Sequence, residues 1–198
     1  MKNFFENLIS EITKLPGIGE KTAERIVLYM LKRDEKENES LAMYIKDLKK
    51  IIKSCSICGN FSEKEICNIC SDPERDRKKI CVVEEARYIR ILEKTELFKG
   101  LYHVLGGVIS PIHGIGPEQL KVKELIERVQ KENTEEIILA LNQTTEAELT
   151  GLYLAKILKS YNVTITRLLS GIPVGTDLEF VDIMTLSRSI EGRQKISN

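Results

Sequence analysis

Cys55-Ser-Ile-Cys58-Gly-Asn-Phe-Ser-Glu-Lys-Glu-Ile-Cys67-Asn-Ile-Cys70 carries two Cys-x-x-Cys pairs with eight residues between them. Four thiolates at this spacing can surround one zinc ion tetrahedrally, because zinc accepts sulfur ligands in that geometry. A catalytic zinc keeps one position open for water, and four cysteines leave none. The spacing therefore predicts a structural zinc site formed by Cys55, Cys58, Cys67 and Cys70.

The same cysteines could instead form two disulfides or a redox dithiol. Disulfides belong to oxidising compartments, and nothing in the sequence marks the chain as secreted. Glu6 stands where a signal peptide would continue its apolar core, and no apolar run approaches the length of a membrane span. We therefore expect a cytoplasmic protein without a membrane attachment, in which Cys81, the fifth cysteine, is a buried strand thiol.

The composition is that of a folded globular protein without a strong charge bias. The 198 residues are 42% apolar, which is enough for one good core and small satellites. Basic and acidic residues number 30 each, so the net charge gives no reason to expect tight nucleic-acid binding. Residues 1–54 hold 11 basic and 9 acidic residues. Phosphate binding there must depend on individually placed side chains and on repetition in an oligomer.

The segment before the cysteines has the apolar spacing of helices. Residues 3–13 and 20–32 each place apolar side chains on one helical face. Between them, Leu15-Pro-Gly-Ile-Gly19 has two glycines that permit a tight turn, while Leu15 and Ile18 can anchor it between the helices. The pattern predicts a helix-hairpin-helix.

The turn itself is a candidate DNA contact. Gly17 and Gly19 leave backbone N–H groups exposed at the start of the second helix, where a phosphate is favoured. Lys21 and Arg25, four residues apart, share a face beside the turn. A hairpin with a merely solvated basic edge is the alternative, but the complete string Leu15 to Ile26 favours contact with the DNA backbone.

Residues 34–40 are expected to be a solvated linker because six of the seven are charged or amide side chains. Ser40 is the expected N-cap of a third helix, which carries apolar residues as far as Ile52 and leads into the cysteines.

The segment after the cysteines predicts an α/β domain with a parallel sheet and helices on both of its faces. A charged connector, 71–79, precedes the first strand, and Glu84 and Asn142 follow two of the strands. Ligands in such folds lie beyond the carboxyl ends of the strands. The expected elements are strands at 80–83, 102–105, 136–141 and 163–168, and helices at 122–130 and 145–159.

Two further segments are expected outside the regular elements. Residues 106–117 are too rich in Gly and Pro for regular structure and should form a long ordered loop. His113 in that loop could meet phosphate and His103 belongs in the core, although a structural role is favoured for both. Residues 171–175 should form a turn before an amphipathic C-terminal helix.

Taken together, the ordered motifs resemble one family, the bacterial recombination mediator RecR. The resemblance spans the whole chain. It is carried by the hairpin at 15–26, the four cysteines, Ser71-Asp-Pro-Glu-Arg-Asp76, Cys81-Val-Val-Glu84, Tyr102-His-Val-Leu-Gly-Gly107 and Gly171-Ile-Pro-Val-Gly175.

The resemblance implies four parts. Residues 1–54 would be a helix-hairpin-helix DNA-binding domain, 55–70 a C4 zinc finger, 78–174 a Toprim domain, and 175–198 a C-terminal segment with an oligomerisation helix. A Walker B-like motif is implied around Leu168 to Asp177. No P-loop sequence Gly-x-x-x-x-Gly-Lys accompanies it, so ATP hydrolysis is not expected from this chain alone.

The resemblance also implies a function. Members of the family resemble clamps that assemble from dimers into ring tetramers around DNA. They work with RecO and RecF at gapped DNA, and help to load recombinase onto single strands. DNA in double- and single-stranded form, RecO, RecF and further copies of the chain are therefore the implied partners, and zinc is the implied metal.

A catalytic Toprim site, by contrast, resembles a Glu at one strand end and an Asp-x-Asp-x-x-Glu-x-Glu run at another, which together hold magnesium. Here Glu84 supplies the first element. Asn142 and Thr144 replace both aspartates, while Glu146 and Glu148 remain. Because two anionic ligands are lost, we expect no enzymatic activity, and a magnesium-dependent enzyme acting on the DNA backbone is the alternative. A zinc-finger transcription factor would need a base-reading helix that is not evident.

The remaining acids have two interpretations. Glu146 and Glu148, in the first turn of a helix, would stabilise its dipole by about 0.3–1 kcal/mol each. Alternatively, Glu84 and Glu146 form an acidic patch that binds a partner, which the resemblance suggests is RecO.

Overall fold

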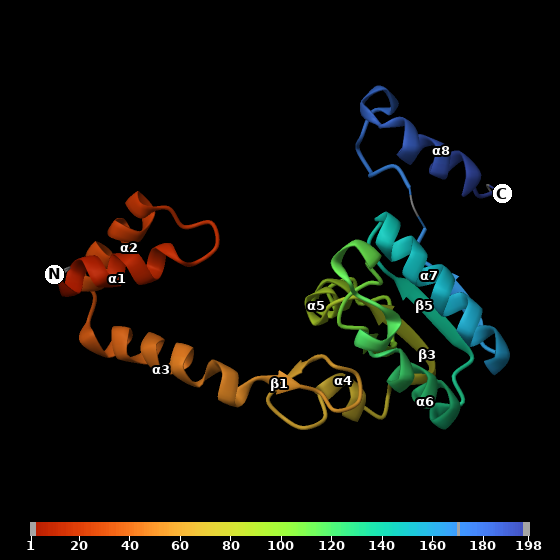
Figure 1. The fold of residues 1–198 in the computed structure, drawn as a ribbon, viewed down its shortest axis with the longest axis horizontal. Helices are drawn as coiled ribbons and strands as arrows, with labels where there is room; N and C mark the ends of the chain where they lie inside the picture. Colours follow the sequence, from red (N-terminus) through yellow and green to blue (C-terminus); the bar gives the residue numbers. More distant parts are fainter. Residues whose placement is uncertain (1–2, 170, 196–198) are drawn as a thin grey trace. The chain divides into compact units, whose positions relative to one another are not determined.

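The computed structural model describes residues 3–169 and 171–195, which fall into two compact units, Met1–Ile51 and Ile52–Asn198. Each unit has its own apolar core. Figure 1 shows the first unit as helices alone and the second as a sheet with helices beside it.

The first unit contains the predicted helix-hairpin-helix. Helix α1 (Phe4–Thr13) begins after Asn3, whose side chain accepts a hydrogen bond from the Glu6 N–H at 2.9 Å. Helix α2 (Glu20–Lys32) packs against α1 through a small core centred on Ile12, Ala23 and Val27. The apolar spacing of the sequence therefore reports the packed faces correctly.

The predicted linker at 34–40 is wrong, because helix α3 (Glu35–Ile51) already begins there. Asp34 caps it: its carboxylate accepts from the Lys36 N–H at 2.8 Å, and its backbone carbonyl accepts from Asn38 at 3.4 Å. Ser40 lies inside the helix and is not its N-cap. Acidic side chains in the first turn favour the helix dipole, so the charges that suggested a linker instead begin a helix.

The cysteine segment opens the second unit as a small module. Strands β1 (Lys53–Ser54) and β2 (Phe61–Ser62) pair antiparallel, and helix α4 (Asn68–Ser71) follows. Neither short strand was predicted, because two residues are too few to show a period.

A four-stranded parallel sheet forms the centre of the second unit, as predicted. Its order is β4-β3-β5-β6, with β4 and β6 at the edges. The strands are β3 (Asp76–Val83), β4 (Gly100–Val104), β5 (Glu136–Ala140) and β6 (Thr164–Arg167).

The connector predicted at 71–79 is wrong over its last four residues. Strand β3 starts at Asp76, which pairs with Gly100, and the pairing shifts register before Ile80. This first half of β3 is largely exposed and therefore keeps charged side chains, whereas only the second half is buried on both faces. Only the second half therefore shows the apolar run that predicts a strand.

Helices cover both faces of the sheet. Helix α5 (Ala86–Glu93) lies on the face that contains Cys81 and Tyr102, while α6 (Val122–Glu132) and α7 (Thr145–Leu158) cover the face with Ile80 and Leu101. In Figure 1, α6 and α7 run alongside the sheet. Alternate residues of β3 thus enter two different cores, and Cys81 is buried as predicted.

The loop and the tail complete the second unit. The loop between β4 and α6 contains two 3-10 turns, Pro111–His113 and Pro117–Gln119. After β6, a turn closes with Thr176 donating to the Pro173 carbonyl, and α8 (Ile183–Glu191) follows. Ser170, within the expected Walker B-like segment, and residues 196–198 lie outside the described residues. In the described parts of the chain, no helix has the length and apolar character needed to cross a membrane.

Candidate zinc centre and nucleic-acid interface

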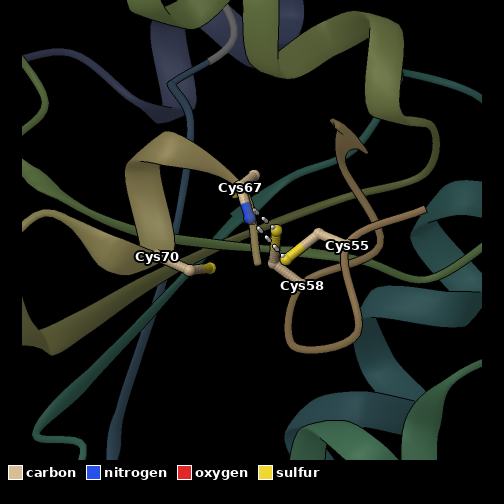
Figure 2. A group of neighbouring side chains, drawn as sticks. All are labelled: Cys55, Cys58, Cys67 and Cys70. Atoms are coloured by element: carbon tan, nitrogen blue, oxygen red, sulfur yellow. Dashed lines mark hydrogen bonds between the residues drawn. The ribbon is translucent and has the colours of Figure 1, made fainter. Parts of the chain in front are cut away.

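Four buried cysteines come together between β1 and α4. Their sulfur atoms all lie within 4.8 Å of one another, and Figure 2 shows the side chains facing a common centre. Cys55 and Cys58 come from a turn closed by Gly59, whose N–H donates to the Cys55 carbonyl at 3.0 Å. Cys67 and Cys70 come from the start and the body of α4. The structure therefore unites all four predicted ligands.

Backbone N–H groups point to two of the four sulfur atoms. The Asn60 N–H points to the Cys58 sulfur at 3.4 Å and the Cys67 N–H to the Cys55 sulfur at 3.3 Å. Hydrogen bonding from Cys58 lowers the pKa of the Cys67 thiol, whereas contacts with the neighbouring sulfur atoms raise the pKa of Cys58 and of Cys70. Four thiolates so close together need a cation to coexist, and buried sulfur-only donors fit Zn²⁺.

The cysteine module also touches the edge of the sheet. The Val104 N–H on β4 donates to the Cys58 carbonyl at 2.8 Å, and Arg77 donates to the Cys70 carbonyl at 3.2 Å. Gly59 has φ of +78°, and a Cβ there would meet the Val104 side chain at 3.1 Å. Glycine therefore permits both the turn and the close approach, so the module covers part of an edge that would otherwise present unpaired backbone groups.

The hairpin turn in the first unit presents an open start of α2. Gly17 has φ of +79°, which only glycine adopts readily, and Ile18 donates to the Leu15 carbonyl to close the turn. Gly19 is the N-cap and offers no side chain to the first N–H groups of the helix. A Cβ built at either glycine would meet nothing within 4 Å. The turn is therefore accessible to a ligand as large as a phosphate.

Lys21 and Arg25 are both exposed on α2. Within residues 3–169 and 171–195, neither forms an ion pair or a hydrogen bond through its side chain. Two unpaired cations thus lie one helical turn apart, directly after an open helix N-terminus.

At the carboxyl ends of β3 and β5, Glu84 and Asn142 are in contact. The Asn142 backbone N–H donates to Glu84 Oε1 at 2.6 Å, and Asn142 Nδ2 donates to Glu84 Oε2 at 2.7 Å. Glu84 is only 7% exposed. Both residues lie at the predicted strand ends, but their pairing was not predicted. Nor was the contact with the neighbouring Tyr88 hydroxyl, which accepts from Asn142 Nδ2 at 3.0 Å.

The other acids of the edge lie on the first turn of α7. Thr144 is the N-cap and accepts from the Ala147 N–H at 3.2 Å. Glu146 is half-buried, and Glu148 accepts from Arg188 at 3.3 Å. Among the residues described, no hydrogen bond links Glu84 to Glu146. The structure therefore joins Glu84 to Asn142, and leaves Glu146 as a separate carboxylate.

The two histidines have structural surroundings. His103 is buried and its Nε2 lies 2.7 Å from the Lys121 carbonyl oxygen. Burial lowers the pKa of His103 to about 4, so the imidazole is neutral at pH 7, as a core residue should be. His113 is exposed in the loop, where its Nδ1 lies 2.8 Å from the Ser110 hydroxyl.

Comparison with known proteins identifies the parts of the chain. Residues 5–49 match the model of the RecR helix-hairpin-helix, 52–72 the four-cysteine zinc finger domain of RecR, 78–169 the Toprim domain and 171–194 the RecR C-terminal region. Together they span the hairpin, the cysteine module, the sheet and the tail.

Relatives match over nearly the full length. The recombination protein RecR of Moorella thermoacetica is 52% identical over 189 residues, covering 96% of this chain and 95% of its own. RecR of Chloroherpeton thalassium is 49% identical over 197 residues and RecR of Acidothermus cellulolyticus 48% over 191, each covering 96% of both chains. The chain belongs to the RecR family.

Proposed function

We propose that the chain is a non-enzymatic, zinc-containing clamp that binds DNA in recombinational repair and helps to load recombinase at gapped or single-stranded DNA. The relatives are named recombination proteins, which supports the repair role. The observation that carries the DNA contact is the open α2 N-terminus at Gly17 and Gly19, beside the unpaired Lys21 and Arg25.

Backbone contact of this kind reads no sequence. A phosphate oxygen accepts from free N–H groups at a helix N-terminus while nearby cations neutralise its charge. Few contacts per subunit give weak and salt-sensitive binding. Repetition of the contact around a ring raises retention without a high net charge, which agrees with the equal numbers of basic and acidic residues.

The first test is binding of zinc-loaded protein to a labelled gapped duplex. The double variant Lys21→Glu/Arg25→Glu should lose affinity on the order of tenfold. The slope of log affinity against log salt concentration should become shallower by the amount expected for about two phosphate contacts. Lys123→Glu/Lys131→Glu on α6 changes the net charge equally at exposed sites and serves as the control. Equal losses in both double variants would show that only total charge matters.

An enzyme acting on the DNA backbone is the second candidate, because the Toprim match includes Glu84 at a strand end. Each binding sample is therefore divided between a native gel and a denaturing gel, with and without magnesium. The clamp predicts a shift on the native gel and intact strands on the denaturing gel. Magnesium-dependent cleavage or rejoining would favour the enzyme.

A homo-oligomer, from dimer to ring tetramer, is part of the proposal. Helix α3 contains no buried residue in the described single chain. A surface helix of a globular protein normally buries one apolar stripe. Its exposed apolar side chains are Leu41, Met43, Tyr44, Ile45, Leu48 and Ile51. A second copy would cover this surface. Ile45→Asp/Leu48→Asp should lower the mass measured by sedimentation, whereas Lys46→Asp should leave it unchanged.

RecO and RecF are the proposed partners. Glu146 lies in the first turn of α7 and, within the described residues, accepts no hydrogen bond through its carboxylate, which supports a role in binding a basic surface. Glu84 is the second acid of the proposed patch, although its two oxygens already accept from Asn142. Glu146→Lys should weaken RecO binding measured by calorimetry. Glu127→Lys, an exposed reversal on α6, is the control.

A further inference from the structure

We infer that Asn142 occupies the place of a divalent cation at Glu84 and thereby keeps the carboxyl ends of β3 and β5 free of metal. The inference rests on the proposed non-enzymatic function and assigns a specificity-determining role to one side chain. It starts from the carboxylate of Glu84, which is 7% exposed and lies where a Toprim enzyme would bind magnesium.

Each oxygen of that carboxylate already accepts a hydrogen bond. The Asn142 backbone N–H lies 2.6 Å from Oε1, and the side-chain Nδ2 lies 2.7 Å from Oε2. Hydrogen bonds to an ionised acceptor are short, as these two are. One residue thus directs two partial positive charges at Glu84 in a fork. A metal ion at this position would offset the charge of the carboxylate in the same way.

The amide has a defined orientation. Nδ2 carries two hydrogens, one directed to Glu84 and the other to the Tyr88 hydroxyl at 3.0 Å. A flipped amide would place its oxygen against the carboxylate and repel it. Tyr88 is held in turn by Arg87, which donates to its hydroxyl at 3.2 Å and lies 5.0 Å from the centre of its ring. The donor group therefore cannot rotate freely away from Glu84.

A cation would have to displace this fork. Magnesium requires near-ideal octahedral geometry and gives up its waters reluctantly, so it gains less from a buried carboxylate whose charge two N–H groups already offset and beside which no second carboxylate stands at position 142. An aspartate at the same position would carry no Nδ2 donor and would add a ligand. The residue at 142 therefore decides between a metal-free and a metal-binding edge.

Thr144 offers a matched comparison, because it lies two residues away and also stands where the catalytic pattern has an aspartate. Its hydroxyl caps α7 by accepting from the Ala147 N–H, and aspartate is an equally good N-cap. Thr144→Asp adds one negative charge and leaves the Asn142 fork in place. Asn142→Asp adds the same charge and removes the side-chain half of the fork, the Nδ2 donor, while the backbone N–H remains.

The experiment is a titration of each zinc-loaded, full-length variant with Mn²⁺ alone, followed by electron paramagnetic resonance. Asn142→Asp should bind Mn²⁺ about tenfold or more tightly than the original chain, whereas Thr144→Asp should stay close to it. The double variant should bind most tightly. Equal gains in the two single variants would show that charge alone decides, and tight binding by the original chain would overturn the inference.

Two further measurements protect the test from misfolding. Asn142→Asp places like charges side by side, so its melting temperature should fall without metal and rise on addition of Mn²⁺. Asn142→Ala, which adds no charge, should show a smaller gain in Mn²⁺ affinity, and no gain in this variant would also contradict the inference. Cleavage of gapped DNA by the original chain would refute the proposed function, while the order of Mn²⁺ affinities tests Asn142 alone.

Discussion

The imidazole of His103 is surrounded by groups that disfavour its charged form. Burial is the main cause of its low pKa, and the nearby Arg128 and Lys121 cations add to it, while the Lys121 carbonyl and Glu124 oppose it. Its Nδ1 has no hydrogen-bond partner within the described residues. A proton on this ring would therefore be unfavourable in the folded chain.

This residue predicts a pH dependence of stability. The folded pKa is about 4, against an ordinary value of 6.5, so the unfolded chain binds the proton more tightly between these values. The contribution of His103 to the free energy of unfolding should be fully present above pH 6.5. It should decrease as the pH falls from 6.5 to 4, by about 3 kcal/mol at most. Urea denaturation at several pH values measures it. His103→Gln, which can still donate to Lys121, should lose less stability on acidification, and an unchanged slope would contradict the assignment.

Arg75 joins three parts of the second unit through one carboxylate. Its guanidinium donates twice to Glu93, at 2.9 and 2.5 Å, and the Tyr102 hydroxyl donates to the same carboxylate at 2.7 Å. Arg75 is the main cause of the lowered pKa of Glu93. The connector after the cysteines, the end of α5 and strand β4 are fixed to one another in this way.

Removal of that carboxylate should destabilise the second unit. Glu93→Ala leaves a largely buried guanidinium and a phenol without their acceptor, and should cost about 2–3 kcal/mol. Thermal or urea unfolding measures the loss. Glu135→Ala, which breaks the exposed pair with Lys78 at 2.6 Å, should change little because water screens that pair. A comparable effect in both variants would contradict the special role of Glu93.

At the scale of elements, a substitution at the start of α2 should affect the stability of the helix and its DNA binding in different ways. The backbone of Gly19, with φ of −86° and ψ of 168°, is one that serine also adopts, and a serine hydroxyl would cap the helix. Gly19→Ser should therefore keep or raise the melting temperature by a small amount and weaken DNA binding, because the hydroxyl takes the N–H groups and fills the approach to them. Gly17→Ser, which would need a positive φ, should lower both. If Gly19→Ser binds DNA with unchanged affinity, the proposed phosphate contact at this site is contradicted.

The sequence predicted the elements that are decided by local chemistry. The hairpin follows from two apolar faces and a turn in which Gly17 needs a positive φ. The zinc ligands follow from spacing within 16 residues, and the alternation of strands and helices fixes the parallel sheet. These signals are all short in range.

The failures share a different cause. The sequence predicts Ser40 as an N-cap, whereas Asp34 caps the helix six residues earlier. Serine and aspartate suit that role equally well, so the residue types alone do not separate the two positions. Helix α5 was not predicted, since its eight residues make only about two turns and are too few to show a helical period. The contact between Glu84 and Asn142 joins positions 58 residues apart, so only the paired strands bring it into view.

At the scale of the whole molecule, the zinc site and the hairpin should respond independently to a chelator. Removal of zinc should expose the cysteine module and the edge of β4, which are joined by the hydrogen bond from Val104 to Cys58. Hydrogen exchange of the full chain should therefore increase at 52–72 and 100–104. Exchange in α1 and α2, whose core is separate, should not change. Uniform protection after complete zinc loss, measured by metal analysis, would contradict this coupling.

The position of the cysteine module along the chain has a consequence for biosynthesis. Its four ligands leave the ribosome before Gly100, and at the usual speed of translation the interval is roughly 2 to 6 seconds. When β4 emerges, a metal-loaded module can already offer the Cys58 carbonyl to the new strand edge. In a chain made without zinc, the module is not yet ordered when β4 emerges, and the outer backbone groups of β4 stay unpaired. We therefore expect the zinc supply during synthesis, rather than after it, to set how many new chains fold without pairing with one another.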